Sequence, residues 1–172
     1  DTCGFLRPVA YLHKSLWTKE PMVHIAVMDK ALDVAPATKA HWDWPKMVSH
    51  WTLPRQLVGQ RVKVATFSTC SAVELLVNGR SAGIKKRADF PDRMITWDVA
   101  YEPGRIEARG LEGGEVKASH LLQTAGEPAR LRLTADRSVI RADGRDLCYL
   151  EVQVTDKDGI LVPSAGAQIH FR

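Results

Sequence analysis

The dipeptide Asn78-Gly79, between two strand-like segments, is the feature that most restricts what this chain can fold into. The segment before it runs from Val73 to Val77 and the segment after it from Arg80 to Ile84. A two-residue connection of type I′ needs positive φ at both of its residues, and Asn-Gly supplies this at low cost. The sequence therefore predicts a tight antiparallel hairpin at this position.

Other short segments show the period-two alternation or the turn-bounded length of β-strands. Ile95, Trp97 and Val99 alternate with polar residues, which predicts that Trp97 lies in a core. Together with the hairpin, eight strands are predicted: Met22–Met28, Lys46–Thr52, Arg61–Phe67, Val73–Val77, Arg80–Ile84, Met94–Val99, Arg105–Leu111 and Glu115–Leu122. This spacing predicts an all-β fold, an immunoglobulin-like β-sandwich over residues 22–123.

The two ends of the chain differ from this middle part. Apolar residues at helical spacing follow Pro8, which predicts a short amphipathic helix over residues 8–19, ended before Pro21. After a linker at 124–128, further strands are predicted at Ala129–Ala135, Leu147–Thr155 and Ala167–Phe171. An immunoglobulin-like domain needs about seven strands. We therefore expect residues 124–172 to form only a truncated second sandwich.

Composition excludes several classes of protein. With 45% hydrophobic and 26% charged residues, the chain is neither disordered nor collagen-like. Apolar runs are far shorter than the roughly 20 residues of a membrane span, so no membrane contact is expected. The net charge of +4 is weak, and its densest run, Lys85 to Arg87, fits a solvated turn better than a nucleic-acid patch. The chain begins with Asp1 and without a visible signal peptide, so we expect a piece of a longer protein.

No residue pattern indicates a metal or a cofactor. Cys3, Cys70 and Cys148 form no Cys-x-x-Cys pair, and the six histidines lack metal-ligand spacing. Isolated cysteines of this kind are usually small buried residues, although one disulfide plus a free thiol stays open. The acidic turn at 156–159 begins like a calcium loop but lacks further ligands, so we expect a glycine-closed turn there.

The tryptophans allow two interpretations. Indole rings suit stacking on sugar rings, which makes Trp42 and Trp44 candidate sugar-binding residues. Alternatively these two and Trp51 fill the sandwich core and a seam with a neighbouring domain, which we expect. Trp17, near the end of the predicted helix, either borders a substrate pocket or packs into an interface.

Four segments, taken in order, resemble bacterial β-galactosidases of glycoside hydrolase family 2. The first, Asp1 to Phe5 with Ser15-Leu16-Trp17, is similar to the segment that closes the catalytic barrel of these enzymes. The hairpin from Val73 to Gly83 is similar to the family pattern VELxxNGxSxG. The segment from Trp97 to Gly110 resembles the pattern WxVxYxPGxxxAxG, and residues 124–147 resemble the start of the next immunoglobulin-like module.

The resemblance implies an organisation. Residues 1–21 would be the C-terminal end of the catalytic TIM barrel, residues 22–123 a complete accessory sandwich and residues 124–172 part of a second one. The chain would then be the non-catalytic C-terminal portion of a β-galactosidase-like hydrolase that acts on carbohydrate. Its partner would be the catalytic barrel of the same protein, in an enzyme whose compartment stays open, with periplasmic and secreted locations both compatible.

The same resemblance places the catalytic residues elsewhere. A retaining glycosidase uses two carboxyl groups about 5–5.5 Å apart. In this family the acid/base glutamate follows an asparagine, and the single asparagine here, Asn78, precedes Gly79. Both catalytic glutamates are therefore expected upstream of Asp1, the chain alone is expected to be inactive, and no catalytic residue is assigned.

Two further hypotheses follow from the residues. A carbohydrate-binding or adhesion module is the alternative function, with the tryptophans holding a polysaccharide. If the second sandwich is incomplete, its strands present unpaired edges and apolar faces, which favour pairing with another chain. Residues 129–172 are therefore expected to self-associate or to be mobile.

Overall fold

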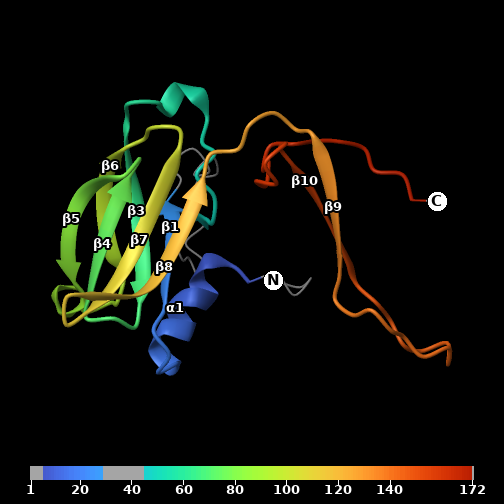
Figure 1. The fold of residues 1–172 in the computed structure, drawn as a ribbon, viewed down its shortest axis with the longest axis horizontal. Coiled ribbons are helices and arrows are strands. Elements are labelled where there is room, and N and C mark those ends of the chain that lie inside the picture. Colours follow the sequence, from blue (N-terminus) through green and yellow to red (C-terminus); the bar gives the residue numbers. More distant parts are fainter. Residues whose placement is uncertain (1–5, 29–44, 172) are drawn as a thin grey trace. The chain divides into compact units, whose positions relative to one another are not determined.

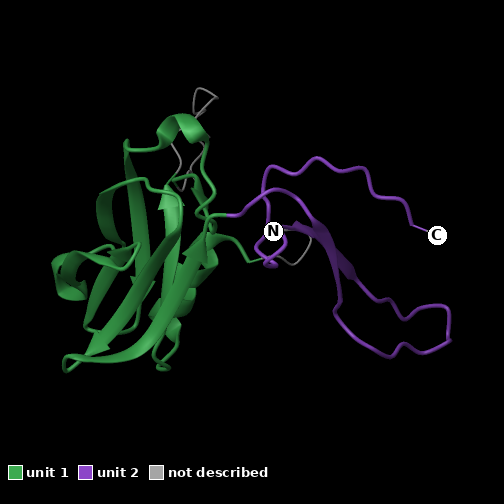
Figure 2. Ribbon diagram, turned by 45° about the horizontal axis from the view of Figure 1, so that its top comes forward, with its two compact units in different colours: residues 1–124 green, residues 125–172 purple. Residues whose placement is uncertain are grey.

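The computed structural model describes residues 6–28 and 45–171, and its elements are drawn in Figure 1. The chain divides into two compact units, Asp1–Thr124 and Ala125–Arg172, coloured separately in Figure 2. Within the described ranges, no helix is both long and apolar enough to cross a membrane.

Unit 1 is a β-sandwich preceded by one helix. One antiparallel sheet has the strand order β2-β1-β3-β6, and the other has the order β5-β4-β7-β8. The strands are β1 Val23–Met28, β2 Met47–Val48, β3 Arg61–Ser68, β4 Ala72–Val77, β5 Arg80–Lys86, β6 Ile95–Ala100, β7 Arg105–Glu112 and β8 Glu115–Gln123. Short 3-10 turns lie at Arg55–Leu57 and Arg87–Asp89. The predicted all-β sandwich is confirmed.

The main core lies between the two sheets. Trp97 is 3% exposed and Ile95 is fully buried, as the alternation along β6 predicts. Trp51 is also fully buried, and its indole N–H donates to the carbonyl of Glu102 at 3.0 Å. The core interpretation of Trp97 and Trp51 is therefore confirmed.

The Asn78-Gly79 hairpin has the predicted geometry. Asn78 has φ 49° and Gly79 has φ 78°, and Val77 pairs with Arg80 across the turn. The Asn78 carboxamide oxygen accepts the backbone N–H of Arg105 at 2.8 Å, so this side chain also joins the hairpin to the β6–β7 turn. In that turn Gly104 has φ +131°, and a Cβ there would lie 2.1 Å from the Asn78 oxygen.

Helix α1, Pro8–Trp17, covers the outer face of the first sheet. Proline is suited to the first helical position because its missing N–H has no partner there anyway. Leu12 is buried in a second apolar cluster that includes Ala26 of β1, Ala65 and Phe67 of β3, and Met94. The central part of this sheet is therefore buried on both faces, whereas the alternation over Arg61–Phe67 is typical of a strand with one buried face.

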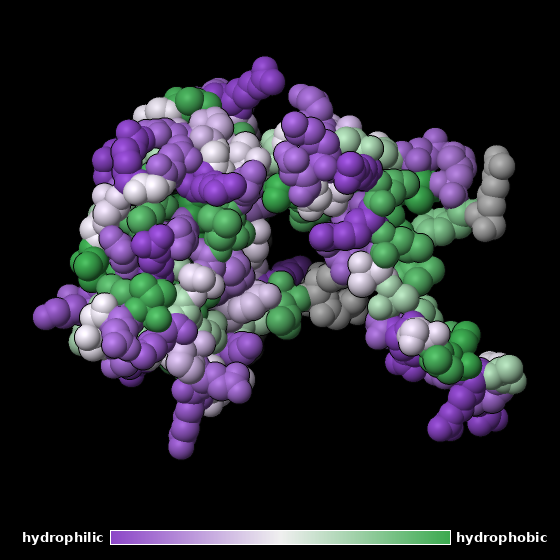
Figure 3. Space-filling model, in the orientation of Figure 1, coloured by the Kyte–Doolittle hydropathy of each residue, from purple (hydrophilic) through white to green (hydrophobic). Residues whose placement is uncertain are grey.

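Unit 2 contains a two-stranded antiparallel ribbon of β9, Arg130–Ala135, and β10, Leu150–Thr155. Leu131 pairs with Val154 and Leu133 pairs with Val152, so apolar side chains share one face of the ribbon. Leu131 is 58% exposed and Leu133 is 60% exposed. Figure 3 shows hydrophobic residues at the surface of this unit.

Three strand predictions differ from the structure. The strand predicted over Lys46–Thr52 is limited to two residues because the backbone pairs with β1 only at Met47 and Val48. The segment predicted from Leu147 enters the ladder only at Leu150, because the N–H of Tyr149 donates to the Asp136 carboxylate instead. Residues 167–171 form no strand, so the prediction there is wrong: alternation supplies a pattern but not the neighbouring backbone that a strand requires.

The turn at 156–159 is closed by Gly159, with φ +81°, as expected. The Asp156 carboxylate accepts the backbone N–H groups of Gly126, Asp158 and Ile160 at 2.8–2.9 Å. These hydrogen bonds, first of all the one from Gly126, hold the pKa of Asp156 below its ordinary value. The carboxylate oxygens are thus directed at the backbone of the turn.

The cysteines within the described ranges are free thiols. Cys70 is buried, as expected of a small hydrophobic residue, and Cys148 is half-buried. Cys3 lies outside the described residues.

Candidate functional site

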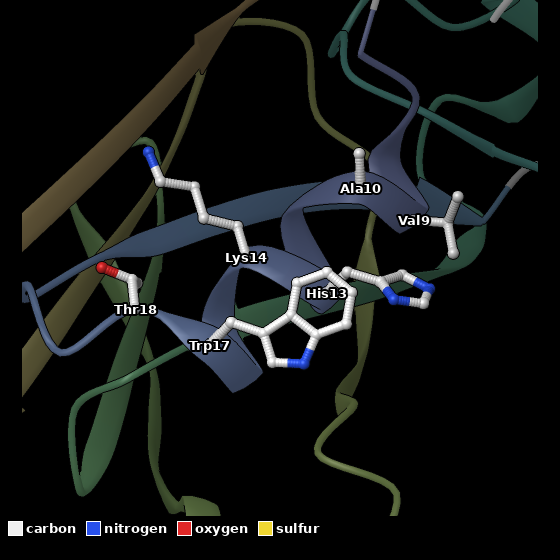
Figure 4. A pocket seen from close by; sticks show the side chains of 6 residues that line it. All are labelled: Val9, Ala10, His13, Lys14, Trp17 and Thr18. Carbon is white, nitrogen blue, oxygen red and sulfur yellow. The ribbon is translucent and has the colours of Figure 1, made fainter.

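The outward side of α1 carries the most exposed tryptophan of the described chain. Val9, Ala10, His13 and Trp17 recur at helical spacing, so they lie on one side of the helix, opposite the buried Leu12. With Lys14 and Thr18 they line a shallow depression, which we call the α1 outer face (Figure 4).

Trp17 dominates the α1 outer face. Its side chain is 79% exposed, and its ring centroid lies 5.4 Å from that of His13 at an interplanar angle of 58° (Figure 4). Leu16 beside it is 51% exposed. The lining of the depression is mainly apolar, as in surfaces that another protein segment covers.

The other sequence-predicted site residues, Trp42 and Trp44, lie outside the described residues. Their sugar-stacking role stays a prediction. Trp51, from the same tryptophan-rich segment, belongs to the core.

The buried His24 lies beneath α1 beside the half-buried His120. The His24 ring stacks on Tyr11 of the helix with centroids 3.6 Å apart, and its Nε2 lies 3.2 Å from the Ser49 hydroxyl. Burial, together with the nearby His120, lowers the pKa of His24 to about 3. His24 is therefore neutral at neutral pH.

The side chain of His120, on β8, accepts a hydrogen bond from the backbone of strand β1. Its Nδ1 accepts the backbone N–H of Ile25 at 3.1 Å, so the proton of the neutral ring resides on Nε2. Burial lowers the pKa of His120 as well. These two histidines are structural, which the sequence analysis did not predict; the signal that could have shown it for His24 is its position between Val23 and Ile25 in an apolar run.

The carboxylates of the sandwich bind local donors. Glu102 pairs with Arg80, Glu107 with Arg109 and Glu115 with Lys117, while Glu74 accepts the Ser81 hydroxyl and Glu112 the N–H of Ser71. These contacts fix turns and strand pairs. Among the described residues, no group of three or more His, Cys, Asp or Glu side chains is arranged to hold a metal ion.

Comparison with known proteins gives two family matches. Residues 59–118 match a domain of unknown function, DUF4982, and residues 131–172 match the glycoside hydrolase family 2 C-terminal domain 5. The two matches lie in unit 1 and unit 2, respectively.

Similar whole proteins are glycosidases. The chain is 34% identical over 172 residues to the β-galactosidase BoGH2A of Bacteroides ovatus, a match that covers 99% of the chain and 17% of that enzyme. It is 29% identical to a β-glucuronidase of Formosa agariphila, covering 99% of the chain and 15% of that enzyme. The chain thus spans less than a fifth of the length of these relatives.

Solved structures agree with this. A glycosyl hydrolase family 2 member from Bacteroides cellulosilyticus has a TM-score of 0.84 and 34% identity, with 92% of this chain and 21% of that chain covered. A β-glycosidase from Bacteroides vulgatus has a TM-score of 0.73 and 31% identity, with 95% of this chain and 18% of that chain covered.

Proposed function

The chain belongs to glycoside hydrolase family 2, and on that premise we propose that it is a non-catalytic portion of a β-galactosidase-like enzyme, which it braces through the α1 outer face. In this proposal residues 1–21 end the catalytic barrel, residues 22–123 are an accessory sandwich and residues 124–172 belong to a second immunoglobulin-like domain. The unit boundary after Thr124 supports this division.

The exposure of Trp17 is the observation that carries the proposal. One side of α1 is packed on the sandwich through Leu12, while the other side presents the Trp17 ring at 79% exposure. Large aromatic side chains at the centre of an interface typically contribute about 2 kcal/mol or more. A partner that covers this ring, which we propose to be the catalytic barrel, would hold the sandwich in place.

A comparison of Trp17→Ala in two contexts tests the docking role. In the 172-residue chain the substitution is expected to change the free energy of unfolding by less than about 0.5 kcal/mol, because the ring makes few contacts there. In the longer glycosidase it is expected to cost about 2 kcal/mol and to lower the melting temperature. Tyr149→Ala, at a ring that is 69% exposed in unit 2, is the matched control. Equal stability of the longer enzyme with and without Trp17 would contradict the proposal.

Activity of the chain itself is a second test. The 172-residue chain is expected to show no turnover of nitrophenyl galactoside, because both catalytic glutamates are proposed to lie outside it. Hydrolysis that galactose inhibits would overturn the non-catalytic assignment.

The exposed indole of Trp17 also supports a second candidate function, direct contact with carbohydrate. In this alternative Trp17 borders the substrate pocket, and Trp42 and Trp44 stack on sugar rings. Titration of galactans is followed by tryptophan fluorescence in the wild type and in Trp42→Ala and Trp44→Ala. A spectrum that no glycan changes would leave only the bracing role.

A further inference from the structure

Three positively charged side chains meet around one hollow in the surface of unit 1. The hollow has a volume of about 330 Å³ and is lined by Ser15, Leu16, Thr18, Lys19, Thr69, Arg87 and Arg93. Its polar groups are thus two guanidinium groups, one ammonium group and three hydroxyls. We call this the basic hollow.

The basic hollow is built from three separate parts of the chain, each held by hydrogen bonds. Thr69 of the β3–β4 turn accepts the N–H of Met22 at 2.8 Å and donates to the carbonyl of Glu20 at 3.0 Å. The backbone N–H of Arg87 donates to the carbonyl of Ser71, and that of Arg93 donates to the carbonyl of Phe90, both at 2.9 Å. The frame that carries the charges is therefore fixed before any ligand arrives.

The charges of the basic hollow lack carboxylate partners within the described part of the chain. The ion pairs found there involve other residues, and none includes Lys19, Arg87 or Arg93. The neighbouring Asp92 carboxylate accepts the N–H of Met94 at 3.0 Å. The hollow thus concentrates charge of one sign.

The partial negative charge at the C-terminal end of α1 is too small to balance the three cations of the basic hollow. A helix C-terminus carries a partial charge of about −0.5, which one cation offsets. Three cations beside it leave an excess of roughly two and a half positive charges. Arg93 also has φ +63°, in the left-handed region that residues other than glycine rarely adopt, and such outliers gather at binding sites.

We propose that the basic hollow binds an oxyanion, either the acidic group of a sugar or a free inorganic anion. Guanidinium groups donate two parallel hydrogen bonds to carboxylate, sulfate or phosphate oxygens, and the ammonium group of Lys19 adds a further charged donor. The volume lies at the lower end of the roughly 300–1,000 Å³ of small-molecule pockets, which fits a ligand the size of one sugar residue.

An NMR titration of the chain tests this with matched ligands. Sodium glucuronate is expected to shift the backbone amides of Thr69, Arg87 and Arg93 saturably, and glucose, which lacks the carboxylate, is not. Sodium phosphate forms the third arm. Glucuronate binding without phosphate binding identifies an acidic sugar as the ligand, and the reverse result identifies a free inorganic anion. Both results support the oxyanion site.

Variants that remove one charge test whether the anion binds in the basic hollow. Arg87→Gln and Lys19→Gln are expected to weaken binding roughly tenfold each, the size of one lost charge-assisted hydrogen bond. Lys63→Gln, at an exposed lysine on β3 that does not line the hollow, makes the same change of net charge and is expected to leave binding unchanged. The proposal is overturned if neither anion shifts these amides. It is equally overturned if Lys63→Gln weakens binding as much as the two pocket variants do, since that is general charge attraction.

Discussion

Acidification is expected to destabilise unit 1 through His24. The folded protein protonates this ring only near pH 3, whereas the unfolded chain protonates it near pH 6.5. Between these values the unfolded state binds more protons, so stability is complete above pH 6.5 and is lost as the pH falls. The slope approaches about 1.4 kcal/mol per pH unit for one such group.

The magnitude follows from the two pKa values. From about pH 7.5 to about pH 5.0, His24 alone removes about 2 kcal/mol from the free energy of unfolding. The lowered pKa of His120 acts in the same direction. Protonation of His120 also puts a proton on the nitrogen that accepts the N–H of Ile25, which removes that hydrogen bond.

Urea unfolding at the two pH values measures this loss. All five tryptophans precede residue 124, so tryptophan fluorescence reports on unit 1. His24→Phe keeps an aromatic ring against Tyr11 but cannot titrate, and it is expected to remove the part of the pH dependence that His24 contributes. His170→Gln, at an exposed histidine of unit 2, is expected to keep the full dependence. A wild-type free energy of unfolding that is equal at both pH values, or a His24→Phe protein that retains the whole dependence, would refute the reasoning.

Three other predictions concern turns and the surface of unit 2. Gly104→Ala is expected to lower the melting temperature of unit 1, measured by fluorescence, because its Cβ would overlap the Asn78 oxygen. Gly59 also has positive φ but open space around it, so Gly59→Ala controls for backbone strain. Equal losses of melting temperature in the two variants would argue against the overlap. Asp156→Ala is expected to make unit 2 more sensitive to protease by removing the acceptor of three backbone N–H groups, and unchanged cleavage rates would contradict this. Self-association through unit 2 is expected to appear as a sedimentation coefficient that rises with protein concentration. Leu133→Glu is expected to reduce this concentration dependence, and the control Lys63→Glu is expected to retain it. A monomer at all concentrations would exclude self-association.

Local sequence chemistry accounts for the parts of the fold that could be predicted. Asn78-Gly79 determines its hairpin through the φ angles of two adjacent residues, so nothing distant is needed. The double-sided burial of β1 depends on α1 packing against it, and the apolar run of β1 does not reveal which element covers its outer face. The false strand at 167–171 has the same origin, because a strand exists only with a paired neighbour.

In the candidate sites, too, local spacing could be predicted from the sequence and contacts between distant segments could not. Helical spacing places Trp17 beside His13, but the exposure of the ring depends on which side of α1 meets the sheet. Lys19 and Arg87 are far apart in the sequence, and only the folded sandwich brings them to one hollow. A run such as Lys85 to Arg87 looks like an ordinary solvated turn until its neighbours in space are known.

The packing of α1 on the first sheet also determines where this protein can be divided. A sandwich that started at residue 22 would leave Ala26, Ala65, Phe67 and Met94 without the helix that covers them. Such a piece would aggregate through that face. The helix and the sandwich therefore have to be transplanted together, so a unit that can be exchanged between enzymes begins no later than Pro8 rather than at the first strand.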